Sequence, residues 1–317
     1  MKERMLPTEE IKNSYPLFYQ TSAYLQEKAF FYRDVFDHPF DFEFAEKMCA
    51  DAYRISRSDW GEYKKKLDDL LRLSLEFLTL QTELEKNGRY RYSTFAEVER
   101  EVFKKDREGG RGGVDYLWGL YFTEVFWATH HRLFQFYRRE FVNKCGEVGT
   151  CLDIPVGTGI FLSHFLTTNS EWKGIGIDLS SQAITAAREL FLVNGQSERV
   201  SLVKEDVYEY AFAGQFERII CVEFLEHVED PLRVLAKLND MLKMNGRIFL
   251  ATVAWAAAID HIYLYKSADE VRYHIARSGF DIEQEYVQNI FPKDAGRLSA
   301  HKTALNFAAI LKKRSLP

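Results

Sequence analysis

Two patterns of hydrophobic positions divide the chain near residue 146. From Glu9 to Val142, apolar residues recur every three to four positions, which predicts amphipathic helices. The clearest stripe consists of five leucines, Leu67, Leu70, Leu71, Leu75 and Leu78. Another helix is expected over residues 93–105, with Ser93 as its N-cap. Residues 115–141 are expected to form one long helix rich in aromatic side chains.

A glycine-rich segment interrupts the helical half between Asp106 and Val114. Four of the five residues from Gly109 to Gly113 are glycines, which favours a flexible joint. A phosphate-binding loop would follow a strand, whereas this segment follows a predicted helix. We therefore interpret the segment as a linker.

The second half alternates short apolar runs with amphipathic stretches, as repeated βαβ units do. Strands are expected over residues 150–154, 174–177, 200–203, 218–222, 247–253, 280–290 and 303–311, and helices over 160–168, 181–193, 231–242 and 268–278. This order predicts an α/β fold with a doubly wound, seven-stranded and mostly parallel sheet. We assign residues 1–142 to an all-helical cap and residues 143–317 to the α/β domain.

Composition and charge narrow the class of protein. The chain has 317 residues, of which 46% are apolar and 28% charged, so a packed globule is expected. The net charge of −5 argues against a nucleic-acid partner, because phosphate binding needs a clustered basic face. The longest apolar run, Ile248–Ile259, is too short to cross a bilayer, and the N-terminus lacks an apolar signal segment. We expect a cytoplasmic protein that does not enter a membrane.

The cysteines show no metal-ligand spacing. None of the four, Cys49, Cys145, Cys151 and Cys221, belongs to a Cys-x-x-Cys pair. Two of them fall within predicted strands, where cysteine packs as a small hydrophobic side chain. The expectation is therefore reduced thiols and no metal site.

A loop with an acid and two glycines follows the first predicted strand. It runs Asp153-Ile-Pro-Val-Gly157-Thr-Gly159, and its glycines let the backbone approach a ligand and turn into a helix. A dinucleotide-binding loop would have a third glycine where Leu162 stands. The acid before the loop suits a ligand with a cationic ammonium group better than a diphosphate.

Single acids also follow the second and third strands. Asp178 lies about 20 residues after the glycine loop, where a carboxylate can accept both hydroxyls of a ribose. Its alternative role is to cap the helix that begins at Ser181. Asp206 can accept the exocyclic amine of an adenine, with Val207 as an apolar wall, although a lone aspartate in a loop is usually a turn residue.

The fourth strand continues into Leu225-Glu-His-Val-Glu-Asp-Pro231. Together with Asp-x-x-x-Gly-x-Gly and the two strand-end aspartates, this segment resembles the class I S-adenosylmethionine (SAM) dependent methyltransferases. The most similar branch contains the quinone-biosynthesis O-methyltransferases. The resemblance covers residues 149–250 and departs from the family at Pro155, where glycine is usual.

The resemblance implies a cofactor site at the strand ends. The methionine part of SAM is expected at Asp153, Pro155, Gly157 and Gly159; the ribose at Asp178 and Leu179; the adenine at Asp206 and Val207; and the methyl end at Glu223 and Phe224. The expected reaction is methylation of oxygen or carbon on a small organic acceptor, with S-adenosylhomocysteine as product.

Histidine and tyrosine side chains are candidates for the acceptor site. His261 and Glu223 are the candidate catalytic groups, and His261 suits removal of a proton from an acceptor hydroxyl because histidine titrates near neutrality. His227, His261, Tyr263 and Tyr121 are the candidate acceptor-binding residues. For each histidine, the alternative is a packing or capping role. The helical cap is expected to act as a lid over this site.

Other functions remain as alternatives. A nicotinamide-dependent oxidoreductase could use a similar sheet, a protein methyltransferase could use the cap for docking, and a SAM-binding scaffold would lack catalysis. A homodimer through the helical cap is a further hypothesis.

Overall fold

The structure is a computed structural model that describes residues 8–32, 40–104, 113–210, 215–291 and 302–314. Before the first strand it has helices α1 (Thr8–Ser14), α2 (Pro16–Lys28), α3 (Phe42–Ile55), α4 (Trp60–Asn87), α5 (Phe95–Val98), α7 (Gly113–Phe126) and α8 (Ala128–Glu140), and the short turns η1 (Phe30–Tyr32), η2 (Glu99–Phe103) and η3 (Val142–Lys144). Most of the predicted linker, residues 105–112, lies outside the described residues.

Strands and helices alternate in the second half, as the sequence predicts. The strands are β1 (Thr150–Asp153), β2 (Lys173–Asp178), β3 (Val200–Lys204), β4 (Phe216–Val222), β5 (Leu242–Ala254), β6 (Phe280–Asn289) and β7 (Leu305–Lys313). The helices are α9 (Ile160–Thr168), α10 (Ser181–Val193), α11 (Pro231–Met241) and α12 (Ala268–Arg277), with short turns η4 (Ser197–Arg199) and η5 (Leu225–His227).

All seven strands form one sheet in the order β3-β2-β1-β4-β5-β7-β6. Neighbouring strands from β1 to β5 pair in parallel, whereas β7 runs antiparallel to both β5 and β6. The strand order reverses between β1 and β4, which is where open α/β sheets bind ligands. The predicted fold is therefore confirmed.

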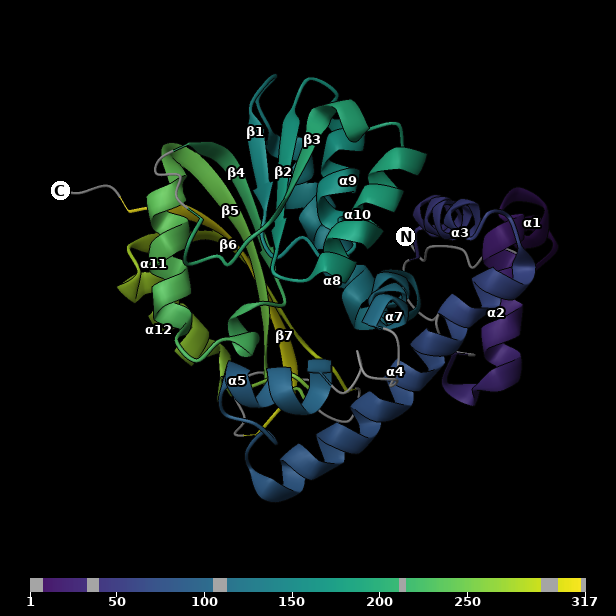
Figure 1. The fold of residues 1–317 in the computed structure, drawn as a ribbon, viewed down its shortest axis with the longest axis horizontal. Helices are drawn as coiled ribbons and strands as arrows, with labels where there is room; N and C mark the ends of the chain where they lie inside the picture. The colour runs from purple at the N-terminus through teal and green to yellow at the C-terminus, as the bar shows by residue number, and fades with distance from the viewer. Residues whose placement is uncertain (1–7, 33–39, 105–112, 211–214, 292–301, 315–317) are drawn as a thin grey trace, which may run out of the picture.

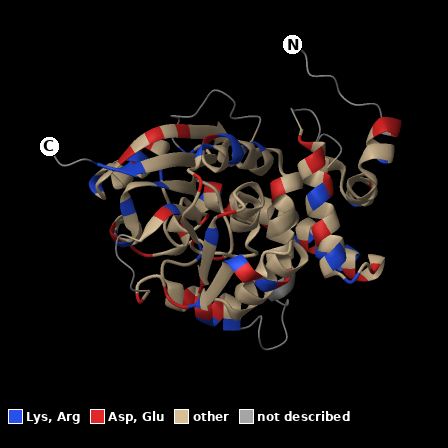
Figure 2. Ribbon diagram, turned by 90° about the horizontal axis from the view of Figure 1, so that it is seen from above, with Lys and Arg blue, Asp and Glu red and all other residues tan. Residues whose placement is uncertain are grey.

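Helices cover both faces of the sheet (Figure 1). Helices α11 and α12 pack on one face, in a cluster that includes Val234, Leu238 and Ile275. Helices α8, α9 and α10 pack on the opposite face, with α1, α2 and α3 farther out on that side, whereas α5 and one end of α4 lie below the carboxyl ends of the strands (Figure 1). In the view from above, Lys and Arg alternate with Asp and Glu along the ribbon of the described residues (Figure 2).

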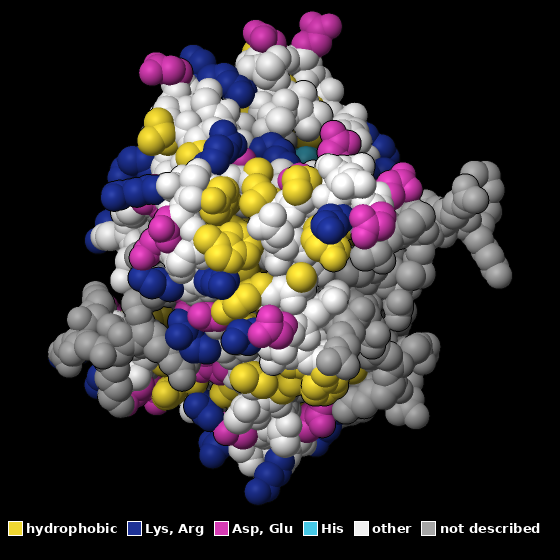
Figure 3. Space-filling model, turned by 90° about the vertical axis from the view of Figure 1, so that its right-hand side faces the viewer, with side chains coloured by type: hydrophobic (Ala, Val, Ile, Leu, Met, Phe, Trp, Pro, Cys, Tyr) yellow, Lys and Arg dark blue, Asp and Glu magenta, His cyan; other side chains and the backbone are white. Residues whose placement is uncertain are grey.

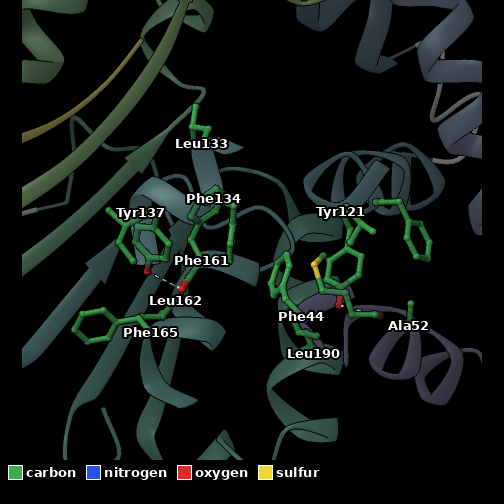
Figure 4. Close-up of a cluster of buried hydrophobic side chains, with 14 of the residues drawn as sticks. Phe44, Ala52, Tyr121, Leu133, Phe134, Tyr137, Phe161, Leu162, Phe165 and Leu190 are labelled. Carbon is green, nitrogen blue, oxygen red and sulfur yellow. Dashed lines mark hydrogen bonds between the residues drawn. The ribbon is translucent and has the colours of Figure 1, made fainter. Parts of the chain in front are cut away.

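The helical cap and the sheet share one hydrophobic cluster. Phe44 of α3 stacks on Phe134 of α8, with ring centroids 4.5 Å apart, and Phe134 lies 5.0 Å from Phe161 of α9 (Figure 4). Tyr137 of α8 donates a hydrogen bond to the carbonyl oxygen of Phe161 at 2.9 Å. The same cluster contains Trp118 of α7. The division at residue 142 thus separates two sequence patterns, not two hydrophobic cores.

Three details of the helical half differ from the sequence predictions. Thr94, not Ser93, is the N-cap of α5, and its hydroxyl forms a reciprocal capping box with Glu97. The predicted long helix breaks at Trp127, whose backbone is extended between α7 and α8. In α4, Leu75 and Leu78 are exposed, because Leu67, Leu70, Leu73 and Leu80 form the buried face.

None of the helices in the described part of the chain combines the length and apolar character needed to cross a bilayer. On the side of the molecule that carries the N-terminal helices, exposed hydrophobic side chains gather in the middle of the face among charged ones (Figure 3). Dimerisation through the helical cap stays a prediction.

Candidate functional site

A cavity of about 950 Å³ lies at the carboxyl ends of the parallel strands. The loops after β1, β2, β3, β4 and β5 form one side, and side chains of α4, α5, η2, α7 and α8 form the other. Asp153, Asp178 and Asp206 all line this cavity, as does Glu223. The three strand-end aspartates, which the sequence predicts at one edge of the sheet, therefore surround the same cavity.

The glycine loop after β1 is held by backbone hydrogen bonds. The amide of Val156 donates to the carbonyl of Ile177 at 2.8 Å, and the amide of Gly157 donates to Asp178 Oδ2 at 3.0 Å. Pro155, which follows a cis peptide bond, lines the cavity. The loop thus keeps its attachment to β2 although proline replaces the usual glycine.

The two loop glycines have different surroundings. Both adopt positive φ, 51° at Gly157 and 78° at Gly159. A Cβ at Gly157 would meet nothing within 4 Å, and this residue lines the cavity. A Cβ at Gly159 would lie 2.9 Å from the ring of Phe191, and this residue is not part of the lining. Gly157 therefore leaves room for a ligand, whereas Gly159 lets α9 pack closely against α10.

Asp153 is 2% exposed and presents an unused hydrogen-bond acceptor. Its Oδ2 atom has no partner among the described residues, and burial raises the pKa of the carboxyl well above its usual range. A buried carboxylate without a partner is costly. A cationic or hydrogen-bonding ligand group in the cavity would remove that cost.

Asp178 connects the ends of β1 and β2. Its Oδ1 accepts the amide of Ser180 at 2.8 Å, while Oδ2 accepts the amide of Gly157. The helix cap itself is Ser180, whose hydroxyl accepts the amide of Ala183. Burial raises the pKa of Asp178 even though these amides favour its ionised form. Each oxygen retains a lone pair for a ligand hydroxyl. Leu179, the next residue, is half-exposed and lines the same cavity.

Asp206 and Val207 lie side by side at the end of β3. Asp206 Oδ1 accepts the amide of Tyr208 at 2.8 Å, which is the turn role considered as the alternative. Both Asp206 and Val207 also line the cavity, so the turn holds a carboxylate and an apolar side chain in place there.

Glu223, directly after β4, adopts the left-handed backbone region with φ 48°. Such strain in a non-glycine residue is typical of functional sites. Burial, together with the nearby charge of Glu124, raises the pKa of Glu223 to about 7. Phe224 follows it and lines the cavity as well.

Glu226 was not singled out from the sequence, although it lies within the motif after β4. It is fully buried, and its Oε2 accepts a hydrogen bond from the Thr252 hydroxyl at 2.6 Å. Oε1 has no hydrogen-bond partner among the described residues. Burial and the neighbouring charge of Glu223 raise the pKa of Glu226 to about 8.

His227 and His261 lie together at the cavity wall, with their rings nearly perpendicular and their centroids 4.8 Å apart. Nδ1 of His227 contacts the carbonyl oxygen of Asp260 at 3.2 Å, and Nδ1 of His261 contacts that of Ala256 at 3.0 Å. Burial and the neighbouring His227 hold the pKa of His261 well below its usual range, so His261 is neutral.

These two histidines and Glu226 are the one group among the described residues that could hold a metal ion. Each offers a ligand atom, and the three atoms lie within 4.8 Å of one another. The sequence showed no such spacing, because His261 is 34 positions beyond His227.

The two tyrosines expected at the acceptor site differ in position. Tyr121 of α7 lines the cavity, and its hydroxyl donates to the carbonyl of Met48 at 3.2 Å. Tyr263 is not part of the lining; its hydroxyl donates to Glu270 at 3.0 Å instead. The expectation that Tyr263 walls the pocket is therefore not met, because Glu270 on α12 holds it outside.

The helical half supplies an apolar wall that the sequence did not identify. Phe77 of α4 and Trp127 lie 5.3 Å apart and both line the cavity, as do Leu73, Phe95, Phe103 and Leu120. Trp127 donates through Nε1 to the Ser74 hydroxyl at 3.0 Å. Since helical periodicity does not tell a core-facing from a cavity-facing stripe, only the fold could identify this wall.

Hydrogen bonds attach this wall to the strand-end loops. Gln81 of α4 donates to the carbonyl of Trp255 at 2.9 Å and accepts the amide of Ala257 at 3.1 Å. Tyr90 donates to the carbonyl of Ala256 at 2.7 Å, and the amide of Phe95 donates to Glu229 at 2.7 Å. These hydrogen bonds connect the helical half to the loops around the cavity.

The chain is similar to known methyltransferases. A ubiquinone biosynthesis O-methyltransferase of Thiobacillus denitrificans is 34% identical over 102 residues, which are 32% of this chain and 43% of that protein. One of Chromobacterium violaceum is 24% identical over 166 residues, 52% of this chain and 68% of that protein. The chain spans less than half the length of the first of these relatives.

Two solved structures share the fold. An O-methyltransferase from neocarzinostatin biosynthesis, in complex with SAM and 2-hydroxy-5-methyl naphthoic acid, has a TM-score of 0.52 at 15% identity, over 80% of this chain and 74% of that one. Mitomycin 7-O-methyltransferase has a TM-score of 0.50 at 14% identity, over 75% and 68%.

The family model described as "Methyltransferase domain" matches residues 126–313. The match includes α8, which the sequence analysis had assigned to the cap, and it extends over all seven strands. The matched segment is more than half of the chain and carries Asp153, Asp178 and Asp206, which line the cavity. The chain therefore belongs to the methyltransferase domain family.

Proposed function

We propose that this protein transfers the methyl group of SAM to oxygen or carbon of a small organic acceptor. The observation that carries the proposal is the convergence of Asp153, Asp178 and Asp206 with the glycine loop around one cavity at the switch point of the sheet.

The described residues fit SAM. Its ammonium group matches the unpartnered Oδ2 of Asp153, and the space beside Gly157 accepts the methionine part. Asp178 retains lone pairs for the ribose hydroxyls, and Asp206 with Val207 offers an acceptor and an apolar wall for adenine. A volume of about 950 Å³ leaves space for an acceptor beside the cofactor.

SAM supplies a methyl group that is already activated by the sulfonium charge. The chain's own contribution is orientation, which can lower the barrier by about 7–11 kcal/mol. Glu223 and Phe224 line the cavity, and Glu223 lies near the charge of Glu124 on α7, where the acceptor would approach. His261 and Glu223 are the proposed groups that contact the acceptor.

The acceptor half of the cavity suits an apolar or aromatic molecule. Phe77, Trp127 and Leu120 form its wall, and two hydrogen bonds of Gln81 attach α4 to the loop after β5. We propose that residues 1–142 act as a permanent cover over the acceptor, and that the acceptor is a phenolic, quinone-like or keto-acid compound.

Titration calorimetry with S-adenosylhomocysteine tests the cofactor assignment. The wild type should bind it and should not bind NAD. Asp178→Asn keeps one acceptor oxygen but loses the charge, so it should bind S-adenosylhomocysteine more weakly, whereas Asp240→Asn in the exposed part of α11 should not. Unchanged affinity in Asp178→Asn would contradict the proposal.

Turnover distinguishes an enzyme from a scaffold. The protein is incubated with SAM and a panel of phenolic, quinone-like and keto-acid acceptors, and methylated products are measured by mass spectrometry. The proposal predicts a product with at least one class. Affinity for S-adenosylhomocysteine without any product would favour the SAM-binding scaffold.

A further inference from the structure

We propose that His130 of the helical half takes the proton from the acceptor hydroxyl, and that Glu124 is a positioning residue that orients it. Both residues line the cavity from the helical side, Glu124 near the end of α7 and His130 near the start of α8. The assignment rests on the proposed function and concerns an acceptor that is methylated on oxygen. His261 then contacts the acceptor without taking its proton.

The hydrogen bonds around His130 assign its ring hydrogen to Nδ1. The Thr123 hydroxyl lies 3.0 Å from Nδ1, and it donates its single proton to the carbonyl oxygen of Leu120 at 2.7 Å. Toward the imidazole this hydroxyl can therefore only accept, so Nδ1 is the donor and Nε2 carries the lone pair. Every polar contact between His130 and the other described residues involves Nδ1. Nε2 is thus available to a ligand in the cavity.

Glu124 faces the same ring nitrogen. Its Oε1 lies 3.5 Å from Nδ1 of His130, and its Oε2 has no hydrogen-bond partner among the described residues. Glu124 is only 8% exposed. A buried carboxylate beside Nδ1 keeps the imidazole in this tautomer and stabilises the imidazolium that forms when Nε2 takes a proton, as in the acid–histidine pairs of serine hydrolases.

The helix break at Trp127 makes this arrangement possible. In an unbroken helix, Thr123 and Glu124 would lie about 10.5 and 9 Å from His130 along the axis, too far for contact. The extended backbone of Trp127 ends α7 and lets α8 bring His130 back beside both side chains. The Trp127 indole packs edge-on against the imidazole, with ring centroids 5.1 Å apart. The ring is therefore held in place, and its side chain keeps 17% exposure.

The charge of the cavity favours a protonated histidine. Besides Glu124, carboxylates of three facing elements belong to the lining: Glu76 on α4, Glu99 in η2 and Glu223 after β4. Among the described residues of the lining, Lys204 at the end of β3 is the one lysine or arginine. Since nearby negative charge stabilises an imidazolium, this cavity supports proton transfer to His130.

The proposed step balances in atoms and charge. Nε2 of His130 forms a bond to the hydroxyl proton, and the electron pair of the broken O–H bond stays on oxygen. This oxygen forms a bond to the SAM methyl carbon, while the carbon–sulfur bond breaks and its electron pair stays on sulfur. The products are the methyl ether and S-adenosylhomocysteine, and the imidazolium passes its proton to solvent. A positioned base of this kind contributes roughly 10²–10⁴-fold in rate.

The test uses 4-nitrophenol as the probe, because its phenolate form absorbs visible light and reports proton transfer without turnover. The full chain is mixed with the probe, with and without S-adenosylhomocysteine, and phenolate absorption is recorded across pH. In the wild type the neighbouring imidazolium should raise the ionisation constant of the bound probe roughly 10- to 1000-fold over the free compound. Absorption identical to that of free 4-nitrophenol would overturn the proposal.

Variants assign the effect to the two residues. His130→Asn keeps a donor in the position of Nδ1 but lacks Nε2, so it should abolish the shift, whereas His274→Asn, outside the lining, should keep it. Glu124→Gln should reduce the shift, because the charge that stabilises the imidazolium is lost, and Glu189→Gln on the exposed side of α10 should not. A full shift in His130→Asn would overturn the base assignment, and a full shift in Glu124→Gln would overturn the positioning role.

S-adenosylhomocysteine affinity is measured by calorimetry on the same samples, and its retention verifies that each variant is folded. If the probe ionises through His130 but the wild type does not bind S-adenosylhomocysteine, the proposed function fails while the proton-accepting role of His130 stands. The two failures are therefore distinguishable.

Discussion

Replacing each loop glycine by alanine separates ligand contact from packing. Both residues have positive φ, so either alanine would cost about 1–2 kcal/mol of folding stability through backbone strain. At Gly157 the added methyl group meets nothing within 4 Å and points into the space assigned to SAM. At Gly159 it would lie 2.9 Å from Phe191, which adds an overpacking cost of about 1–3 kcal/mol.

Gly157→Ala should therefore be more stable than Gly159→Ala but should bind S-adenosylhomocysteine more weakly. If the methyl group removes one charge-assisted hydrogen bond to the cofactor, worth about 1.5–3 kcal/mol, the Kd for S-adenosylhomocysteine rises roughly 10- to 150-fold. Gly159→Ala should lose more stability, because its methyl group meets the ring of a neighbouring helix.

Chemical denaturation gives the two stabilities, and calorimetry gives the two affinities. Wild-type affinity in a folded Gly157→Ala protein would refute the placement of the cofactor against this loop. Greater stability loss at Gly157 than at Gly159 would refute the packing argument.

Two further predictions concern the two halves of the cavity. Asp153→Asn removes a buried carboxyl group whose pKa is raised in the folded state, so the thermal stability of the variant relative to the wild type should increase as the pH rises from about 4. Its affinity for S-adenosylhomocysteine should fall roughly 10- to 150-fold. A difference in melting temperature that does not depend on pH would contradict the stability argument. Phe77→Ala should raise the KM of an accepted substrate without changing the Kd of S-adenosylhomocysteine. The control Leu75→Ala, on the exposed face of the same helix, should change neither constant. A changed Kd in Phe77→Ala would place that side chain against the cofactor.

The sheet was predictable because its signals are local. Asp153 and Asp178 end apolar runs and Asp206 follows one closely, and parallel strands bring their carboxyl ends to the same edge. The mostly parallel sheet and the cofactor side of the cavity follow from these repeated units. The break at Trp127 was missed, because the aromatic pattern continues through it and no proline or glycine marks the extended residue.

The acceptor side was less predictable, because its contacts join distant segments. Gln81 and Tyr90 contact the loop after β5, more than 160 positions away, and neither belongs to a motif. Glu226 belongs to the Leu-Glu-His segment that the sequence analysis noted. Its complete burial and the lack of a hydrogen-bond partner at Oε1 among the described residues are properties that a single sequence does not show. Tyr263 failed as a wall residue because Glu270, seven positions on, binds its hydroxyl.

The single hydrophobic cluster that runs from α3 through α8 to α9 limits how such a protein can diversify. Parts that meet through a few polar contacts can be exchanged between relatives, but here Phe44, Phe134 and Phe161 interlock across the boundary. A chimera that joins this sheet to a foreign cap would expose those rings and is expected to aggregate. New acceptor specificity would arise instead by substituting individual side chains, such as Phe77 and Leu120, that face the cavity without anchoring the cluster.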